Sequence, residues 1–205
     1  MKKAKIISAL IVFTLLSTTA CKKGENDPVL SLKSRTSRLV GTWKLVNGSE
    51  TTIDYDAGDQ ETSTSVTTDD GAISTNVFTF QDQNGSVTNT SQSFTHTLEY
   101  TFEKDGSFNY SDVFDGDSQI DKGYWYWSGK SKTQGLKKKE VVVITITETN
   151  DGQIDTYVGT AINIDGSFQL DRLTKKEMTL IIDQKRTKSN GDTFSRISTL
   201  NFEKQ

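Results

Sequence analysis

The sequence predicts an all-β protein in which antiparallel strands follow one another up and down and close into a barrel of about eight to ten strands. Three observations support this fold class. Apolar and polar residues alternate along several segments. The same segments are rich in Val, Ile, Thr and aromatic residues, which favour strands. Turn-forming dipeptides separate them at short intervals, so neighbouring strands are joined locally, and a meander barrel is favoured over a sandwich with long crossovers.

The clearest hairpin lies in the middle of the chain. Leu98, Tyr100 and Phe102 share one face of a strand, and the alternation resumes at Phe108 and Tyr110 after a short polar turn that contains Gly106. Further turns are expected at the dipeptides Asn84-Gly85, Asp151-Gly152, Asp165-Gly166 and Asn190-Gly191. Strands are expected over 141–149, 154–164, 178–187 and 193–202, with one short helical turn over 174–177.

One region departs from the alternating pattern. Residues 59–75 are rich in Thr, Ser and Asp and contain few apolar residues. We expect a long exposed loop or an irregular hairpin there, either without a role of its own or at the rim of a cavity.

The composition excludes several classes of protein. The chain has 205 residues, with 24 Lys and Arg against 27 Asp and Glu, so nothing suggests a nucleic-acid partner. The mean hydropathy of -0.54 excludes a helical membrane bundle. With one His and one Cys, a single chain can form neither a His- or Cys-rich metal site nor an internal disulfide bond. We therefore expect no cofactor and no metal.

The N-terminus has the features of a targeting segment. Lys2, Lys3 and Lys5 precede an apolar run over 6–16, which is too short to span a bilayer and is typical of a secretory signal. Small residues then lead to Cys21, an arrangement that resembles the signal of bacterial lipoproteins. The resemblance implies that residues 1–20 are removed and that the Cys21 thiol is acylated. The alternative is an ordinary signal peptide followed by an incidental cysteine.

The lipoprotein resemblance also predicts the location and organisation of the chain. The residue after Cys21 is Lys22 rather than the Asp that favours retention in the inner membrane, so we expect an outer-membrane lipoprotein of the cell envelope. Residues 21–38 hold the only proline and few large apolar residues, as a flexible tether does, and 39–205 form the domain. A membrane-spanning barrel is disfavoured because Glu99, Asp183 and other charged side chains would face the lipid.

A second resemblance concerns the domain. It begins with Gly41-Thr42-Trp43, followed by aromatic segments at 100–108 and 123–127 and by the segment 170–180. Their order and spacing resemble those of bacterial lipocalin-like lipoprotein domains, although the second and third lipocalin motifs are not evident. The resemblance implies a barrel with a cavity, and a basic residue near the C-terminus that covers Trp43. We expect Arg196 in that role, with Arg186 and Lys204 as the other candidates.

The aromatic residues have two interpretations. They either line a cavity for a small apolar or amphipathic ligand, or form a packed core. The six residues in question are Tyr100, Phe102, Phe108, Tyr110, Trp125 and Trp127. The first interpretation predicts a lipid-anchored binding or carrier protein. The second predicts a solid-cored envelope module that binds a protein or a glycan through its loops, particularly residues 59–75.

Catalytic chemistry has little support in the sequence. We expect His96 to face inward as a structural residue, and no hydrolase, protease or phosphate-binding motif is present, so no catalytic residue and no enzyme activity are predicted. Asp112, Asp115, Asp117 and Asp121 crowd one predicted loop, but their spacing does not fit a calcium loop. The lysines at 137–139 are expected to solubilise a turn.

Overall fold

The computed structural model describes residues 26–28, 31–68, 71–130, 132, 140–149, 167–187 and 191–205. In these residues the protein is all-β, which confirms the predicted fold class. The short helix α2 (Arg35–Leu39) precedes ten antiparallel strands. They are β1 (Gly41–Asp56), β2 (Asp59–Thr67), β3 (Ile73–Gln81), β4 (Val87–Phe102), β5 (Ser107–Phe114), β6 (Asp117–Trp127), β7 (Val141–Glu148), β8 (Ser167–Leu173), β9 (Glu177–Thr187) and β10 (Thr193–Lys204).

Several sequence-based expectations fall outside the described residues. They are the signal segment 1–20, Cys21, Lys22, the lysines at 137–139, the strand expected over 154–164 and the turns at Asp151-Gly152 and Asp165-Gly166. Among the described residues, the only helix has five residues, and none of them forms a helix long and apolar enough to cross a membrane.

The strands form a closed ring in which sequence neighbours are paired and β10 returns to β1. At one end of the barrel the ring contains fewer strands, because Gly41–Lys44 of β1 pairs directly with Glu99–Phe102 of β4. At this level β2 and β3 are left out, and the other eight strands close the barrel. The predicted meander therefore forms, with the β2–β3 hairpin inserted between two strands that also contact each other directly.

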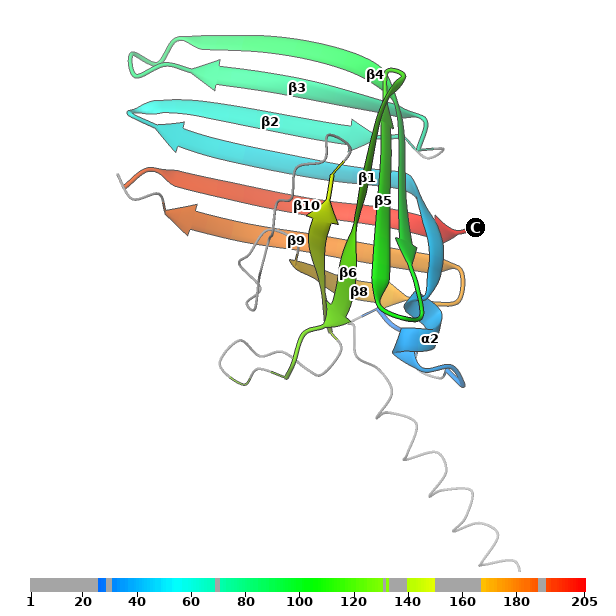
Figure 1. Ribbon diagram of the computed structural model, residues 1–205. Helices are drawn as coiled ribbons and strands as arrows, with labels where there is room; N and C mark the ends of the chain where they lie inside the picture. The colour runs from blue at the N-terminus through cyan, green and yellow to red at the C-terminus, as the bar shows by residue number, and fades with distance from the viewer. Residues whose placement is uncertain are drawn as a thin grey trace, which may run out of the picture.

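Beyond this ring the long strands continue as a second sheet, which we call the sheet extension. It comprises residues 182–187, 193–198, 48–56, 59–67, 73–81 and 87–95 of β9, β10, β1, β2, β3 and β4. Figure 1 shows these strands running side by side across the view, past the upright β5 and β6. The branch point lies at the β1 bulge between Leu45 and Asn47, where the β2–β3 turn approaches so closely that a Cβ on Gly71 would lie 2.1 Å from the Leu45 carbonyl oxygen.

The ring around Trp43 encloses a packed core. Trp43, Phe102 and Leu170 have no exposed surface, and the Phe102 ring contacts Phe108 at 5.1 Å and Trp125 at 5.8 Å between centroids. Edge-to-face and tilted pairs of this kind stabilise an aromatic core beyond the burial of area alone. This end of the barrel is therefore filled with side chains.

Helix α2 closes the filled end of the barrel. Ser34 caps it by accepting a hydrogen bond from the Ser37 backbone amide at 3.1 Å, and the indole Nε1 of Trp43 donates to the Leu39 carbonyl oxygen at 2.7 Å. Lys204 places its ammonium 4.9 Å from the centre of the Trp43 ring, and donates to the carbonyl oxygens of Arg38 and Val40. The first strand, the last strand and the helix are thus locked together at one indole.

This geometry corrects the sequence-based choice of Arg196 as the residue that covers Trp43. In the β1–β10 register Trp43 lies opposite Lys204, whereas Arg196 lies opposite Thr52, many residues farther along the strand. The choice of Arg196 was wrong because residue type alone does not fix the register between the first and last strands.

The described part of the predicted flexible tether is held against the barrel. In its described part, Asp27 is 3% exposed and forms ion pairs with Arg35 at 3.3 Å and Arg38 at 3.5 Å. Asp27 accepts a hydrogen bond from the Leu173 backbone amide at 2.8 Å, and Arg35 donates to the Leu170 carbonyl oxygen at 2.6 Å. The segment is therefore held to β8. The sequence pattern misses this because isolated charged residues in a polar segment normally indicate exposure.

For residues 59–75 the structure decides between the two expected alternatives. The described residues form β2 and the start of β3, so a hairpin is present and not a long loop, and cross-strand Ser and Thr pairs replace the apolar alternation that the sequence lacks. Two further local expectations are corrected. Residues 174–177 form a tight turn between β8 and β9, in which the Thr174 amide donates to Glu177. Of the four crowded aspartates, only Asp115 lies in a turn; the others lie on β5 and β6.

Candidate functional site

A cavity of about 210 Å³ lies where the filled barrel meets the sheet extension. Its apolar floor is formed by Leu45, Leu98 and Leu200 together with the ring of Tyr100. Its polar wall comes from five strands and consists of Glu50, Ser65, Thr67, His96, Tyr110, Asp112 and Arg196. Gly48 also lines it, and a Cβ there would lie 2.8 Å from the Leu200 side chain, so the space depends on glycine at this position. The cavity is therefore amphipathic.

Two larger recesses lie outside the barrel. One of about 580 Å³ lies between Pro28, Ser31 and the fully exposed Leu32 on one side and the β8–β9 turn on the other. The other, about 420 Å³, lies at the tip of the sheet extension beside Asp54 and Glu61. We take the smaller cavity as the candidate site because its polar side chains are joined in a hydrogen-bond network.

The network is a chain of side-chain contacts across β2, β3, β4 and β5. Thr67 and Ser74 share a hydrogen bond of 2.8 Å, and the Ser74 hydroxyl lies 2.9 Å from Nδ1 of His96. Nε2 of His96 lies 3.0 Å from Asp112, whose other oxygen accepts from the Tyr110 hydroxyl at 2.8 Å. Both nitrogens of the only histidine are thus engaged, so the ring is fixed in position.

The order hydroxyl, imidazole, carboxylate is that of a Ser-His-Asp catalytic triad, in which the serine is the nucleophile. A nucleophile must contact its substrate, and Ser74 is 1% exposed and bonded to Thr67 on its other side. The observed geometry therefore gives Ser74 the role of orienting His96.

The contact between Asp112 and Tyr110 affects the pKa of both side chains. Burial opposes ionisation of Asp112, but the hydrogen bonds from His96 and Tyr110 outweigh it and hold the pKa of Asp112 below its usual value. Burial and the neighbouring Asp112 raise the pKa of Tyr110, which therefore remains a neutral donor. Burial likewise raises the pKa of Tyr100. Asp112 thus presents a charged carboxylate to the cavity at neutral pH.

This pair gives a pH-dependent prediction. Tyr110→Phe should lower the free energy of unfolding at pH 7 by about 1 kcal/mol, because it removes one hydrogen bond to a charged acceptor. A depressed pKa stabilises the folded state above the unfolded pKa of about 3.9, and that stability is lost as the pH falls through the folded pKa. The difference between variant and wild type should therefore shrink below about pH 4 in urea denaturation. Tyr124→Phe, at an exposed tyrosine, should show no such dependence; a difference independent of pH would contradict the assignment.

Arg196 also belongs to the polar wall of the cavity. Its Nε and Nη2 donate to one oxygen of Glu50 at 2.9 and 2.7 Å. The guanidinium charge is therefore directed at the neighbouring strand. Arg196 was expected in a different role, and Glu50 could not be assigned to this face from the sequence, because the β1 bulge reverses the alternation between Leu45 and Glu50.

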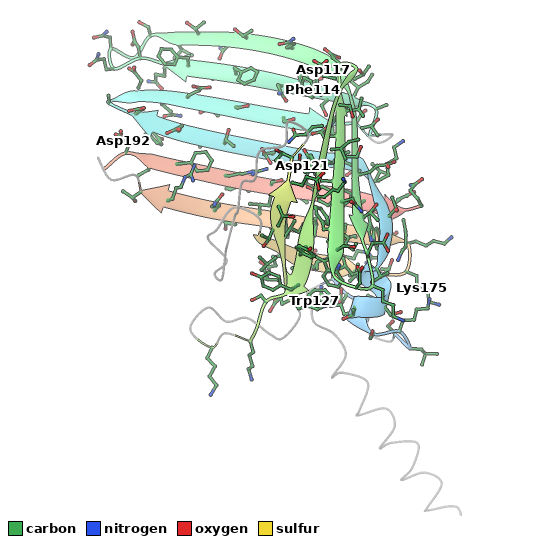
Figure 2. The ribbon with its side chains drawn as sticks, in the orientation of Figure 1. Phe114, Asp117, Asp121, Trp127, Lys175 and Asp192 are labelled. Carbon is green, nitrogen blue, oxygen red and sulfur yellow. The ribbon has the colours of Figure 1, made fainter. Side chains whose placement is uncertain are left out.

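Asp121 lies on β6, opposite Tyr110 in the β5–β6 register. It is 7% exposed, and one carboxylate oxygen accepts from Gln119 at 2.9 Å. In Figure 2, Phe114 and Asp117 mark the far end of the β5–β6 hairpin, and Trp127 lies at the other end, near α2. Asp121 lies between these two ends. Among the described residues, no group of three or more His, Cys, Asp and Glu side chains could hold a metal.

The six aromatic residues proposed as a cavity lining separate into two groups. Phe102, Phe108 and Trp125 are buried in the core, with the Trp125 indole donating to the Glu103 carbonyl oxygen at 2.9 Å. Trp127 packs against the same core and donates to the Thr36 hydroxyl at 3.0 Å. Tyr100 and Tyr110 line the cavity. Contact of any of the six with a ligand stays a prediction.

Sequence reasoning also missed Thr67 and Ser74. Both lie in the polar stretch 59–75, which offered no apolar periodicity from which to assign a face. A signal was present in the repeated alternation of Ser and Thr, but it becomes informative only once the neighbouring strand is known.

Comparison with known proteins adds no relative. No protein-family model matches the chain, and no curated protein matches it either. The geometry of the cavity and the residues that surround it therefore carry the proposed function.

Proposed function

We propose that this protein is a lipid-anchored, lipocalin-like binding or carrier protein of the cell envelope, and that it takes up a small amphipathic molecule. The observation that carries the proposal is the cavity of about 210 Å³, with an apolar floor and a polar wall, at the end of a closed barrel. Ligand sites in proteins combine mostly apolar surfaces with a few placed polar groups. Because typical drug-sized sites have about 300–1,000 Å³, the ligand must be small.

The resemblance to lipocalin-like domains gains support from the closed end. Gly41 opens β1 with a φ of 130°, Trp43 is fully buried, and a basic residue from the last strand covers its ring. Lys204 fills the place for which the resemblance requires a basic residue. The barrel would bind by burying ligand surface, without bond chemistry.

Lipid attachment at Cys21 would orient this barrel. The backbone amide of Asn26 donates to Asp171 of β8 at 3.1 Å, so the chain is fixed to the closed end five residues after Cys21. Five extended residues span at most about 18 Å. The closed end would then face the outer membrane, and the cavity and sheet extension would point away from it. Cys21→Ala should abolish incorporation of labelled fatty acid, and continued labelling would contradict the assignment.

Binding can be tested with a matched pair of variants on β2. Ser65 lines the cavity, whereas its neighbour Thr64 points to the opposite face of the strand. In native mass spectrometry and tyrosine and tryptophan fluorescence with a panel of small amphipathic compounds, Ser65→Trp should abolish binding and Thr64→Trp should leave it unchanged. Absence of any ligand with the wild-type protein, or equal binding by both variants, would contradict the proposed site.

A second candidate function is an envelope interaction module. The sheet extension favours it, because Tyr55, Val77, Phe80 and Val87 are exposed there. Pairing of β4 with β5 begins only at His96, so in the described part of the chain one edge of residues 87–95 has no strand partner. Exposed strand edges of this kind can pair with another chain. A specific cross-link from this edge to one partner, together with an empty cavity, would favour the module over the carrier.

A further inference from the structure

We propose that the cavity selects ligands that carry a cationic amino group, and excludes anionic ones of the same size. This inference rests on the proposed binding function and specifies the chemistry of the ligand. It is carried by the carboxylates at the cavity and by two buried polar atoms beside it that have no hydrogen-bond partner among the described residues.

The charges at the cavity are predominantly negative. Glu50 and Asp112 line it, and Asp121 lies on the strand next to Tyr110. Against these carboxylates stands one guanidinium, Arg196, which already donates two hydrogen bonds to Glu50. His96 approaches Asp112 through Nε2 at 3.0 Å, and no Lys or Arg among the described residues forms an ion pair with Asp112 or Asp121. An anionic ligand would therefore meet repulsion, whereas an ammonium group would meet attraction.

Asp121 supplies the most specific feature. Its Oδ2 accepts from Gln119, but its Oδ1 is buried and has no hydrogen-bond partner in the described part of the chain. A buried acceptor without a donor is costly, and more so when it is charged. Directly opposite residues in an antiparallel pair have Cβ atoms about 5 Å apart, so Asp121 lies beside the Tyr110 side chain that lines the cavity. Asp121 does not line the cavity itself, so it acts on a ligand ammonium next to Tyr110 through the attraction of its charge.

Ser198 provides a second unsatisfied group. It is 1% exposed, lies opposite Glu50 in the β1–β10 register, and its hydroxyl has no hydrogen-bond partner among the described residues. It does not line the cavity itself, so it adds a polar group next to Glu50 without contacting a ligand. The tyrosine rings at the floor and wall would add attraction for a cation through their π-faces.

Three probes of nearly equal size test the proposal on the purified full chain at pH 7. They are benzylamine, benzyl alcohol and benzoate, with binding followed by NMR titration of the backbone amides around Gly48 and Tyr110. We expect benzylamine to bind at least about tenfold more tightly than benzyl alcohol, and benzoate to bind most weakly, since one hydrogen bond to a charged group can account for such a factor.

Matched variants locate the origin of the preference. Asp121→Asn removes the charge with little change in shape and should abolish most of the advantage of benzylamine. Asp183→Asn changes an exposed carboxylate on β9 and should leave it intact. If Asp121→Asn fails to fold, the ranking of the three probes on the wild-type protein still decides the proposal.

The outcomes distinguish a failure of cation selection from a failure of the proposed binding function. Equal or tighter binding of benzyl alcohol or benzoate would overturn the selection for a cation while leaving the cavity as a binding site. Absence of binding by all three probes would instead count against the proposed function. A preference for benzylamine that Asp121→Asn and Asp183→Asn affect equally would overturn the role of Asp121.

Discussion

Asp27→Ala is expected to lower the free energy of unfolding by about 3–5 kcal/mol, because it leaves two buried guanidinium groups without their shared carboxylate. The side chains of Asp27, Arg35 and Arg38 are at most 3% exposed. Burial lowers the pKa of Arg35, and the attraction of Asp27 opposes that effect. Removing the carboxylate therefore leaves the cost of burying the charges and removes the interaction that offsets it.

The control for this prediction is an exposed ion pair. Lys122 and Glu148 are 3.0 Å apart, with side chains that are 55% and 61% exposed, so Glu148→Ala should cost less than about 1 kcal/mol. Asp27→Asn should have an intermediate effect, because its amide oxygen can still accept from the Leu173 amide. Urea denaturation followed by circular dichroism measures all three. A cost for Asp27→Ala as small as that for Glu148→Ala would mean that the segment before α2 does not stabilise the barrel.

Trp43→Ala is the second substitution with a large expected effect, again about 3–5 kcal/mol. The indole is fully buried, donates to the Leu39 carbonyl oxygen and lies under the Lys204 ammonium. Its removal opens a cavity in the core and separates α2 from the first and last strands at one point. Thermal unfolding should show a correspondingly large decrease in Tm.

Tyr124→Ala is a suitable control for Trp43→Ala. Tyr124 is an aromatic residue on β6 that is 60% exposed, so its loss should change the free energy of unfolding by no more than about 0.5 kcal/mol. Similar losses for both variants would show that Trp43 does not anchor the closed end.

The fold was predictable because its signals are local. Alternation from Leu98 to Phe102, and turns at Asn84-Gly85 and Asp105-Gly106, depend on residues close together in the chain, and each lies where expected. The site was less predictable. His96 was expected to face inward, but its partners Ser74 and Asp112 come from two other strands, and only the strand register places them on either side of its ring.

By itself, the sequence determined an all-β meander, the positions of most described strands and the importance of the Gly41-Thr42-Trp43 segment. Tertiary structure decided that Lys204 covers Trp43, that Asp27 is buried, and that β2 and β3 extend the sheet beyond the ring. It also decided where the cavity lies. The physical reason is that alternation assigns a side chain to one of two faces, whereas long-range register and a single bulge in β1 decide which side chains meet on that face.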